Sequence, residues 1–560
     1  MEELIKKYVL QNSIKFDGKP NPGAVIGKIL GEKPELKKDV KDIAKKVNEA
    51  IKDISKTSID EQREALEEIS PELLKEKKHE EKKRELPDFK DTKNVVMRFE
   101  PSPSGPLHIG HAYVLSLNSE YCRKYDGKLI LRIGDTNPEN IYSPAYSLIE
   151  KDANWVTNDN ISKVLIQSDR LEIYYKYMEK LLSLDKVYVC ECDPEEYKQL
   201  NRKGEACPCR DLSKEEQSNR WKKMFKGYKQ GDAVARVKTD LSHKNPAMRD
   251  FPIFRINDSK HPKVGNKFRV WPLMNMAVTV DDIETNVTHV IRAKDHQDNA
   301  LRQKFIYSYL GKKFPEAIFV GRINFAGMPV SSTKARELIE NKTYSGWDDI
   351  RLPFLMALKR RGYKPEAIIK YSIDVGVSLN DKTVKKEEFF KTVNAFNKDF
   401  IDKDAYRYFF VFDPKEVLIE GAPSQDIELD LHPENKKGGR KFKVEDKFYI
   451  TSEDYKSIKE GKLYRLMDCL NFVKENDKLK FDSLEYERFK DAGDKIIHWL
   501  PKEDLIKVEV LMEDNKLVKG VGEAGMKDIK VDDVVQLERY SFVRLDKKEK
   551  NKLSFWYAHK

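Results

Sequence analysis

The segment from Val95 to Ile133 constrains the fold of this chain more than any other feature. Val95–Phe99 is a short β-branched run that stops at prolines, and a helical pattern begins near Leu107. A second apolar run, Lys128–Ile133, follows that helix after an Asp-Gly turn. The order strand, helix, strand predicts two parallel strands joined by a right-handed crossover.

The same pattern returns later in the chain. We expect Val287–Ile291 and Ile318–Val320 to be strands, with a helix over Asn299–Leu310 between them. Between the two halves lies an insertion of about residues 190–267, which carries a cluster of cysteines. The sequence therefore predicts an α/β core that is interrupted by this insertion.

The N-terminal region has a different character. Residues 1–92 show apolar residues at helical spacing, as at Ile5 and Val9, and predict an accessory helical domain. The pattern fades into Lys75–Glu85, where ten of eleven residues are charged. We expect this run to be a solvated helix or a linker.

Two further periodicities follow the α/β core. A helical pattern extends from Ala335 to about Lys398. After Asp404 the chain has short alternating runs between turn residues, such as Tyr406–Val411 and Lys507–Leu511, which indicate β-barrels or sandwiches. A length of 560 residues is compatible with roughly three to four domains.

Composition excludes several classes of protein. No apolar run approaches the ~20 residues of a membrane helix, and the first residues lack a signal-peptide pattern, so we expect a cytoplasmic protein without a membrane partner. Lys and Arg number 105 against 95 Asp and Glu, and the formal charge of +10 suits a polyanionic partner without proving one. Four of the six cysteines lie between Cys190 and Cys209, which favours a metal site over a disulfide framework.

The strongest chemical signal is the string from Phe99 to His111, Phe-Glu-Pro-Ser-Pro-Ser-Gly-Pro-Leu-His-Ile-Gly-His. A Pro- and Gly-rich loop that leads into a helix presents the His108 and His111 imidazoles and free backbone N–H groups to one site, which predicts phosphate binding. Gly110 has no side chain and would let a flat base approach the helix. Two such histidines alone could equally be satisfied structural residues.

This string resembles class I aminoacyl-tRNA synthetases, in the archaeal and eukaryotic form of the glutamyl and glutaminyl branch. Further segments are similar to archaeal glutamyl-tRNA synthetases, namely Leu131–Pro138, Trp271–Asp282, Val290–His296, Gly346–Pro353 and Ala558–Lys560. The resemblance extends from about residue 93 to the end of the chain. It implies a multidomain α/β protein with a Rossmann-type parallel-sheet catalytic core.

The resemblance also implies a domain order. After the helical N-terminal domain, it places the first half of the core at 93–189, the acceptor-end-binding insertion at 190–267, the second half of the core at 268–334, a helical domain at 335–403 and antiparallel anticodon-binding β-barrels at 404–560. The implied reaction uses ATP with Mg²⁺ to convert L-glutamate to glutamyl-adenylate, and then transfers glutamate to the 3′ end of tRNA(Glu). Charging of tRNA(Gln) stays open, as do two rivals, a glutaminyl-tRNA synthetase and a synthetase-like RNA-binding protein without aminoacylation activity.

Individual residues take roles by the same resemblance. Lys334 matches the lysine of a mobile loop that holds the triphosphate, although the stretch Pro329–Arg336 has no lysine between its serines. Arg98 and Arg292 would face the substrate, and Arg292 favours glutamate, because a guanidinium pairs better with a carboxylate than with an amide. A structural ion pair is the alternative role for Arg292. The implied ATP-binding residues are Pro101, Gly110, Ser331, Ser332, Thr333 and Lys334, and the implied glutamate-binding residues are Arg98, Ser102, Asp135, Met274 and Arg292.

Two positions depart from the family pattern. Relatives usually carry an acidic residue where Gly134 stands, which pairs with the α-amino group of the substrate, and a tyrosine where Met274 stands. These changes predict weaker glutamate binding and partial rescue by Gly134→Glu. Asp135 could take over only if the strand bulges, because successive strand residues face opposite sides.

Two further sites complete the sequence-based expectations. Cys190, Cys192, Cys207 and Cys209 form two C-x-C pairs that could close a tetrahedral zinc site, with buried free thiols as the alternative. The C-terminal region carries basic residues near aromatics, a combination that binds tRNA phosphates and bases. These basic residues are Lys436, Lys437, Arg440, Lys441 and Lys443.

Overall fold

The computed structural model describes residues 2–15, 18, 20–70, 73 and 85–560, without the side chains of residues 15, 34, 37, 38 and 435–437. The chain divides into two compact units, Met1–Lys83 and Arg84–Lys560. Within the described ranges, no helix is both long and apolar enough to cross a bilayer. The charged run Lys75–Glu85 falls, apart from Glu85, outside these ranges.

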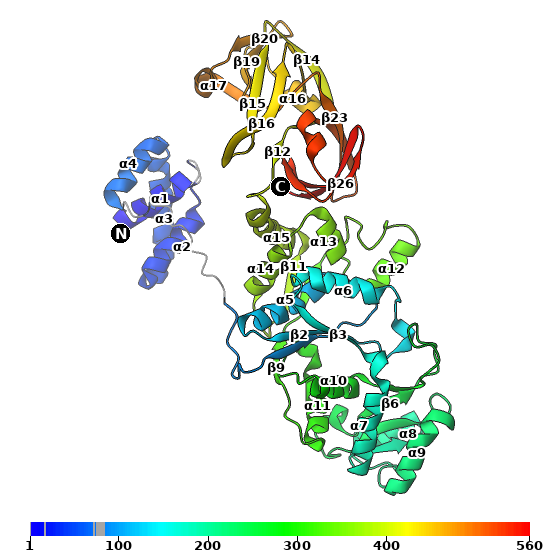
Figure 1. Cartoon of the computed structure of the whole chain (residues 1–560). Coiled ribbons are helices and arrows are strands. Elements are labelled where there is room, and N and C mark those ends of the chain that lie inside the picture. The colour runs from blue at the N-terminus through cyan, green and yellow to red at the C-terminus, as the bar shows by residue number, and fades with distance from the viewer. Residues whose placement is uncertain (1, 16–17, 19, 71–72, 74–84) are drawn as a thin grey trace. The chain divides into compact units, whose positions relative to one another are not determined.

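The N-terminal unit is helical (Figure 1). Asn21 caps α2 through a bond to Ala24, and Ser58 and Glu61 form a capping box at α4. Ile5 and Val9 lie in its buried core, in agreement with the helical spacing. Its elements are α1 (Glu2–Lys15), α2 (Pro22–Glu32), η1 (Pro34–Asp39), α3 (Val40–Ile54) and α4 (Ile59–Ile69).

The second unit starts with the predicted parallel sheet. Strands β1 (Val96–Phe99), β2 (Lys128–Ile133) and β3 (Ile161–Ile166) pair in parallel in that order. A further parallel pair, β8 (His289–Ala293) and β9 (Glu316–Val320), lies beside β1, where Thr288 N–H donates to Val96 O. The helices of this core are α5 (Ile109–Lys124), α6 (Ala145–Val156), α10 (Met274–Glu284) and α11 (Gln297–Tyr309).

The segment just before β1 differs from expectation. Residues 85–92, expected to belong to the N-terminal helical domain, contain no helix. Leu86 and Phe89 are buried in the core of the parallel sheet, and Phe89 stacks on Tyr121 and His289 with ring centroids 4.2 Å apart in each case. Packing against aromatic partners far along the chain decides this conformation, and helical periodicity does not report such contacts.

The cysteine-bearing insertion is built on an antiparallel sheet with its own core. Strands β4 to β7 pair in sequence order, and Trp221 and Trp271 are buried beside them. The elements of this region are α7 (Leu171–Ser183), β4 (Val187–Cys190), α8 (Pro194–Lys203), α9 (Lys214–Lys226), β5 (Val234–Val237), β6 (Pro252–Ile256) and β7 (Val270–Pro272).

The region after the core is mainly helical, but it contains one strand that periodicity did not predict. Strand β11 (Lys382–Lys385) pairs in parallel with β10 (Ile323–Ala326) and so ties the helices to the end of the α/β core. The helices are α12 (Ser332–Glu340), α13 (Leu355–Arg361), α14 (Pro365–Val375) and α15 (Lys386–Ile401).

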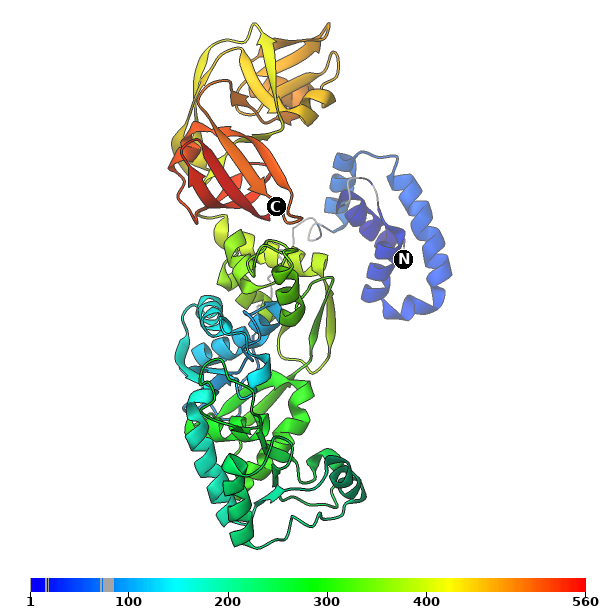
Figure 2. The same ribbon diagram turned by 90° about the vertical axis from the view of Figure 1, so that its right-hand side faces the viewer.

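The C-terminal region consists of two seven-stranded mixed sheets and the hairpin β15–β16 (Figure 2). The run expected as one strand over Tyr406–Val411 is split at Phe409, whose N–H donates to the Glu523 carboxylate. Its two parts pair with different strands of the same sheet.

The strands of this region are β12 (Arg407–Tyr408), β13 (Phe410–Phe412), β14 (Pro414–Glu420), β15 (Gln425–His432), β16 (Asn435–Val444), β17 (Lys447–Thr451), β18 (Leu463–Leu466), β19 (Asn471–Glu475), β20 (Lys478–Ser483), β21 (Gly493–Ile497), β22 (Leu500–Pro501), β23 (Leu505–Leu511), β24 (Leu517–Glu523), β25 (Val534–Leu537), β26 (Ser541–Glu549) and β27 (Lys552–His559). Two short helices, α16 (Ser452–Ser457) and α17 (Tyr486–Ala492), join some of them.

Candidate active site

The Pro- and Gly-rich loop connects β1 to the N-terminus of α5. His108 is the N-cap of α5 in an extended conformation, and its Nδ1 atom accepts a hydrogen bond of 3.0 Å from Gly110 N–H. A Cβ atom at Gly110 would lie 3.0 Å from the His108 ring, so the glycine makes room for this imidazole. Pro101 is buried and Ser102 is exposed at the start of the loop.

The two histidines form a stacked pair at the start of α5. Their ring centroids are 3.8 Å apart, and the Nδ1 atom of His111 is buried without a hydrogen-bond partner in the described part of the chain. Burial lowers the pKa of His111 to about 4, and burial together with the neighbouring His111 lowers that of His108 well below its usual value. Both imidazoles are therefore neutral near pH 7 and act there as hydrogen-bonding groups.

The second signature stretch lies against this loop. A Cβ atom at Gly105 would lie 3.0 Å from Ser332 Cβ and 3.0 Å from Trp347, so the glycine permits close approach of the two motifs. Helix α12 begins at Ser332, three residues earlier than predicted, and Ser331 is its N-cap. Thr333 and Lys334 are exposed in its first turn, where backbone N–H groups are free of intrahelical partners.

A buried cluster of charged groups lies where β1 and β2 end. Arg132 donates to Glu100 at 2.6 Å and lies 2.8 Å from Asp282. Arg98 donates to Asp282 at 3.3 Å and lies 4.0 Å from Glu100. No role was predicted for Glu100, Arg132 or Asp282, although the period of two along β1 places Glu100 on the same face as Arg98.

Arg292 at the end of β8 differs from the other guanidiniums of this cluster. Its Nη1 atom donates to Gln303 Oε1 at 3.0 Å, while its buried Nε atom has no partner. No carboxylate lies within ion-pair distance of Arg292 among the residues that the structure describes, so its predicted alternative role in an internal ion pair finds no support. Burial, and then repulsion by Arg98, lowers the pKa of Arg292 to about 10.

The cluster as a whole carries excess positive charge. Its members are the guanidiniums of Arg98, Arg132 and Arg292 and the carboxylates of Glu100 and Asp282, beside the ion pair of Arg170 and Asp281. Three positive groups meet two negative ones, and the Arg170–Asp281 pair adds no net charge. Burying an unbalanced charge is costly, so the site suits a ligand of net charge −1.

Asp135 lies on the opposite side of the sheet from this cluster. Its carboxylate accepts hydrogen bonds from Ser168 N–H at 2.8 Å, from Ser168 Oγ at 2.7 Å and from the Tyr146 hydroxyl at 2.7 Å. The residue is buried, and no register shift occurs at the end of β2 to turn it around. These contacts argue against the predicted role of Asp135 in binding the substrate ammonium group.

Met274 is exposed at the start of α10. It lines a separate pocket of about 500 Å³ together with Arg236, Arg249 and Arg302. The backbone that carries Met274 is close to the cluster, because the next residue, Asn275, accepts a hydrogen bond from Gln303, the partner of Arg292.

The four clustered cysteines converge in the insertion. Their Sγ atoms all lie within 4.8 Å of one another, with Cys190 and Cys207 3.9 Å apart and Cys192 and Cys209 3.7 Å apart. Zn–S bonds of ~2.3 Å in a tetrahedron require S···S separations of about 3.8 Å. The Cys209 sulfur also accepts from Arg220 Nη1 at 3.2 Å and from Glu191 N–H at 3.4 Å, donors that stabilise a thiolate.

The chain is similar to known proteins over most of its length. Residues 94–403 match the family model of the class I (E and Q) tRNA synthetase catalytic domain. Residues 405–487 and 469–546 match two models of the anti-codon binding domain of the same synthetases.

This chain belongs to the class I tRNA synthetases of the E and Q group.

Three relatives are named glutamate–tRNA ligase, and each alignment covers 100% of both chains. The relative from Methanococcus maripaludis strain C6 is 44% identical to this synthetase, that from Methanocaldococcus jannaschii 43%, and that from Thermococcus kodakarensis 42%. The match therefore includes the N-terminal helical unit, which lies outside the three family models.

In the C-terminal region of the synthetase, part of the predicted tRNA-binding surface is buried. Arg440 is buried, donates to Glu523 at 3.0 Å and to Glu538 at 3.2 Å, and lies over the Phe409 ring at 4.3 Å. Its charge is therefore neutralised inside the protein. Phe442, an aromatic residue within this basic stretch, is buried as well.

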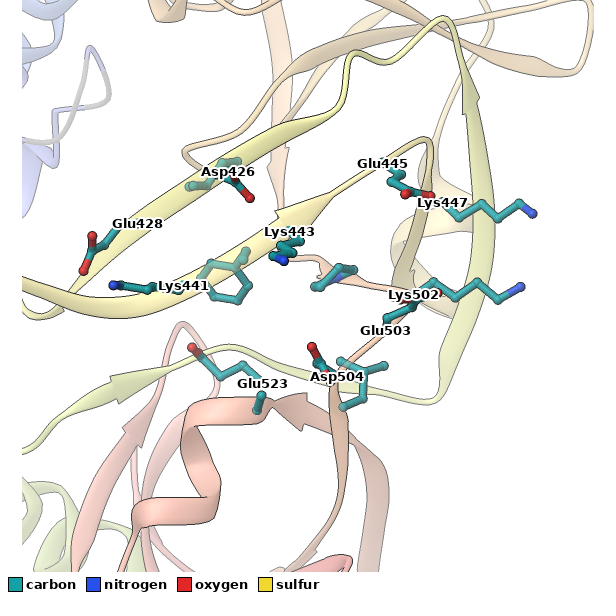
Figure 3. A pocket seen from close by; sticks show the side chains of 15 residues that line it. Asp426, Glu428, Lys441, Lys443, Glu445, Lys447, Lys502, Glu503, Asp504 and Glu523 are labelled. Carbon is teal, nitrogen blue, oxygen red and sulfur yellow. The ribbon is translucent and has the colours of Figure 1, made fainter.

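Lys441 and Lys443 are exposed but share their surroundings with carboxylates. They line a groove of about 800 Å³ between the β15–β16 hairpin and the opposite wall that carries Asp504 and Glu523 (Figure 3). The acidic residues of this groove are Asp426, Glu428, Glu445, Glu503, Asp504 and Glu523. The groove is not a simple basic surface, and the side chains of Lys436 and Lys437 lie outside the described residues.

Proposed function

We propose that this synthetase is a glutamate–tRNA ligase, which activates L-glutamate with ATP and transfers it to the 3′ end of tRNA(Glu). The observation that carries the proposal is the buried Arg292 guanidinium, which has no carboxylate partner among the described residues. The side-chain carboxylate of glutamate supplies the missing counter-charge, whereas the amide of glutamine does not.

The balance of charge in the cluster supports the same choice. Free glutamate has two carboxylates and one ammonium group, so its net charge of −1 offsets the one excess positive charge of the site. Glutamine is neutral overall and would leave that charge buried without compensation. A site that pairs a buried guanidinium with the substrate carboxylate rejects an analogue without that carboxylate, because the buried guanidinium then has no partner.

Adenylation requires in-line attack of the substrate carboxylate on the α-phosphate of ATP. The carboxylate is already ionised at neutral pH, so the protein has to position the reactants and stabilise charge rather than remove a proton. The neutral His108 and His111 imidazoles would donate hydrogen bonds to phosphate oxygens, and Lys334 would neutralise charge on the triphosphate. Mg²⁺ bound to ATP would offset further phosphate charge.

The remaining predicted ATP residues lie on the two adjoining motifs. Pro101 and Gly110 belong to the first motif, and Ser331, Ser332 and Thr333 form the start of α12 in the second. The first turns of α5 and α12 supply backbone N–H groups that suit phosphate oxygens. We retain Ser102 as a proposed contributor to the substrate pocket, and Met274 only through its backbone, which leads to Asn275 beside Gln303.

Zinc is the proposed structural metal of the insertion. Cys190, Cys192, Cys207 and Cys209 would hold it, and it would fix the two C-x-C segments against β4. Metal analysis of the purified protein should give about one zinc per chain. Cys207→Ser should lower this content and the thermal stability of the insertion, whereas Cys469→Ser, at a buried lone cysteine of the C-terminal region, should leave the zinc content unchanged.

The tRNA would contact the insertion through its acceptor end and the C-terminal sheets through its anticodon. tRNA(Glu) is the proposed partner, and charging of tRNA(Gln) is an open second activity of the same site. A cytoplasmic location follows from this function, because tRNA is charged where it is used.

ATP–pyrophosphate exchange tests the proposal directly. The exchange should depend on L-glutamate and not on L-glutamine, and it should be measured with and without tRNA. Exchange that depends on glutamine would favour a glutaminyl-tRNA synthetase. No exchange with either amino acid in the presence of tRNA would favour an RNA-binding protein without aminoacylation activity.

A further inference from the structure

A small gap lies beside Gly134 at the end of β2. A Cβ atom at this position would lie 3.5 Å from Glu100 Oε1 and 3.6 Å from Gln167 Oε1, which is ordinary van der Waals contact. The two polar atoms nearest to the gap are thus both oxygens. A positively charged hydrogen-bond donor fits between two such acceptors, whereas an anion does not.

Glu100 reaches this gap because of the parallel register of β1 and β2. Phe99 pairs with Leu131, so that Glu100 follows beside Arg132, and Gly134 N–H continues the pattern by donating to Pro101 O at 3.0 Å. Residues 132 and 134 share one face of the strand. The side chain of Glu100 therefore extends over the position where Gly134 has none.

The two oxygens of Glu100 are used unequally. Oε2 accepts from Arg132 at 2.6 Å and 3.0 Å, while Oε1 accepts, among the described residues, one long bond of 3.4 Å from Gln167 Nε2. In the described part of the chain, no donor reaches Gln167 Oε1. Both acceptors at the gap thus have lone pairs to spare.

Glu100 is also not the sole counter-ion of its arginine neighbours. Asp282 lies 2.8 Å from Arg132 and 3.3 Å from Arg98, and so bridges both guanidiniums. The side chain of Glu100 is 14% exposed, against 4% for Asp282. Glu100 is therefore the more accessible of the two carboxylates.

We propose that Glu100 binds the α-ammonium group of the substrate, in place of the acidic residue that the family pattern leads one to expect at position 134. This inference rests on the proposed function, because the ammonium group belongs to the amino acid. It reverses the expectation of weakened glutamate binding, since the carboxylate missing from β2 is supplied by the neighbouring strand. The site then reads both ends of glutamate, with Arg292 at the side-chain carboxylate and Glu100 at the ammonium.

The test compares two ligands that differ only in the ammonium group. Binding of L-glutamate and of glutarate, which has the same two carboxylates but no amino group, is measured by titration calorimetry on the full chain. Glu100→Gln keeps the size of the side chain and removes its charge. The ratio of glutamate affinity to glutarate affinity should fall by about ten- to a hundredfold in this variant.

Asp282→Asn is the matched control. It removes one negative charge beside the same two arginines without touching the gap, so it measures the effect of charge alone on glutamate (net charge −1) and glutarate (net charge −2). The ratio should fall clearly less in Asp282→Asn than in Glu100→Gln, and an equal fall would show that Glu100 acts through its charge and not through contact with the ammonium group. Glu100→Ala combined with Gly134→Glu should restore the ratio, because the new carboxylate enters the gap from β2. Gly134→Glu alone should not improve glutamate binding, since it sets two carboxylates side by side.

The possible outcomes separate the two proposals. If Glu100→Gln weakens both ligands equally or leaves the ratio unchanged, Glu100 is only a structural partner of Arg132, and glutamate activation stands. If Glu100→Gln does not fold, the variant that combines Glu100→Ala with Gly134→Glu decides. If this double variant does not reproduce the wild-type ratio of glutamate affinity to glutarate affinity, the assignment of Glu100 is overturned. If the wild-type protein binds neither ligand and shows no exchange with glutamate, the proposed function itself fails.

Discussion

The charged cluster at the ends of β1 and β2 and the β15–β16 region contain the same kind of group, a buried arginine, with opposite outcomes. Arg440 is neutralised by Glu523 and Glu538 and is covered by Phe409. Arg292 has only an amide oxygen as partner among the described residues. A buried guanidinium therefore marks a ligand site only where the chain itself does not supply the counter-charge.

Removing Arg292 should give the largest effect. Arg292→Ala would leave the side-chain carboxylate of glutamate buried without its partner, so kcat/KM for glutamate should fall by about a thousandfold while the KM for ATP changes little. Arg292→Lys keeps the charge but not the planar fork, and should retain part of the activity. An unchanged preference for glutamate over glutamine in Arg292→Ala would contradict the comparison.

Removing Arg440 should cost stability instead of specificity. Arg440→Ala leaves Glu523 buried and unpaired, so the free energy of unfolding should drop by about 3 kcal/mol, as measured by urea denaturation. Glutamate binding should be unaffected. A loss of glutamate activation without loss of stability would show that Arg440 belongs to a ligand site after all.

The loss of stability in Arg440→Ala should also depend on pH. Burial raises the pKa of Glu523 even beside Arg440, and without the guanidinium the pKa rises further. A carboxyl whose pKa is higher in the folded than in the unfolded state binds its proton more readily when folded, so stability increases as the pH falls. The destabilisation should therefore be greater at pH 7.5 than at pH 5.

The buried His108 and His111 side chains differ from the two arginines, because desolvation leaves them uncharged. His108→Ala or His111→Ala should slow adenylation by about a hundredfold with little change in tRNA affinity, because one hydrogen-bond donor to the phosphates is lost. The pKa of His111, about 4, means that the neutral form persists down to that pH. Exchange rates should thus show no histidine titration between pH 8 and 5.5, and a fall with an apparent pKa near 6.5 would refute the neutral pair.

Substitution of Lys441 and Lys443, the exposed lysines in the groove beside the β15–β16 hairpin, should give the smallest effect. Lys441→Ala combined with Lys443→Ala should weaken tRNA binding by less than about threefold, because carboxylates in the same groove already offset their charge. Filter binding at two salt concentrations would measure both the affinity and its salt dependence. A tenfold loss with a shallower salt slope would instead identify these lysines as phosphate contacts.

Local patterns in the sequence were sufficient for much of the fold. The β-branched run, the Pro- and Gly-rich loop and the second apolar run predicted the parallel β1–β2 pair, because strand, turn and helix propensities act over a few neighbouring residues. The two C-x-C pairs predicted a common cluster, because paired short spacings are typical of metal ligands, and the four Sγ atoms do lie together. The non-helical segment 85–92, strand β11 and the division at Phe409 were not predicted, since partners far along the chain impose them.

Which charges are balanced was decided only by the tertiary structure. The sequence shows that Arg98, Arg292 and Arg440 lie in or beside regions predicted to form strands, but it does not show which of them has a counter-ion. Folding brings Asp282 to Arg98 and Glu523 to Arg440 from positions that are 184 and 83 residues away, and brings no carboxylate to Arg292 among the described residues. Coulomb energies in a buried site depend on separations of a few ångströms, and spacing along the chain does not specify those separations.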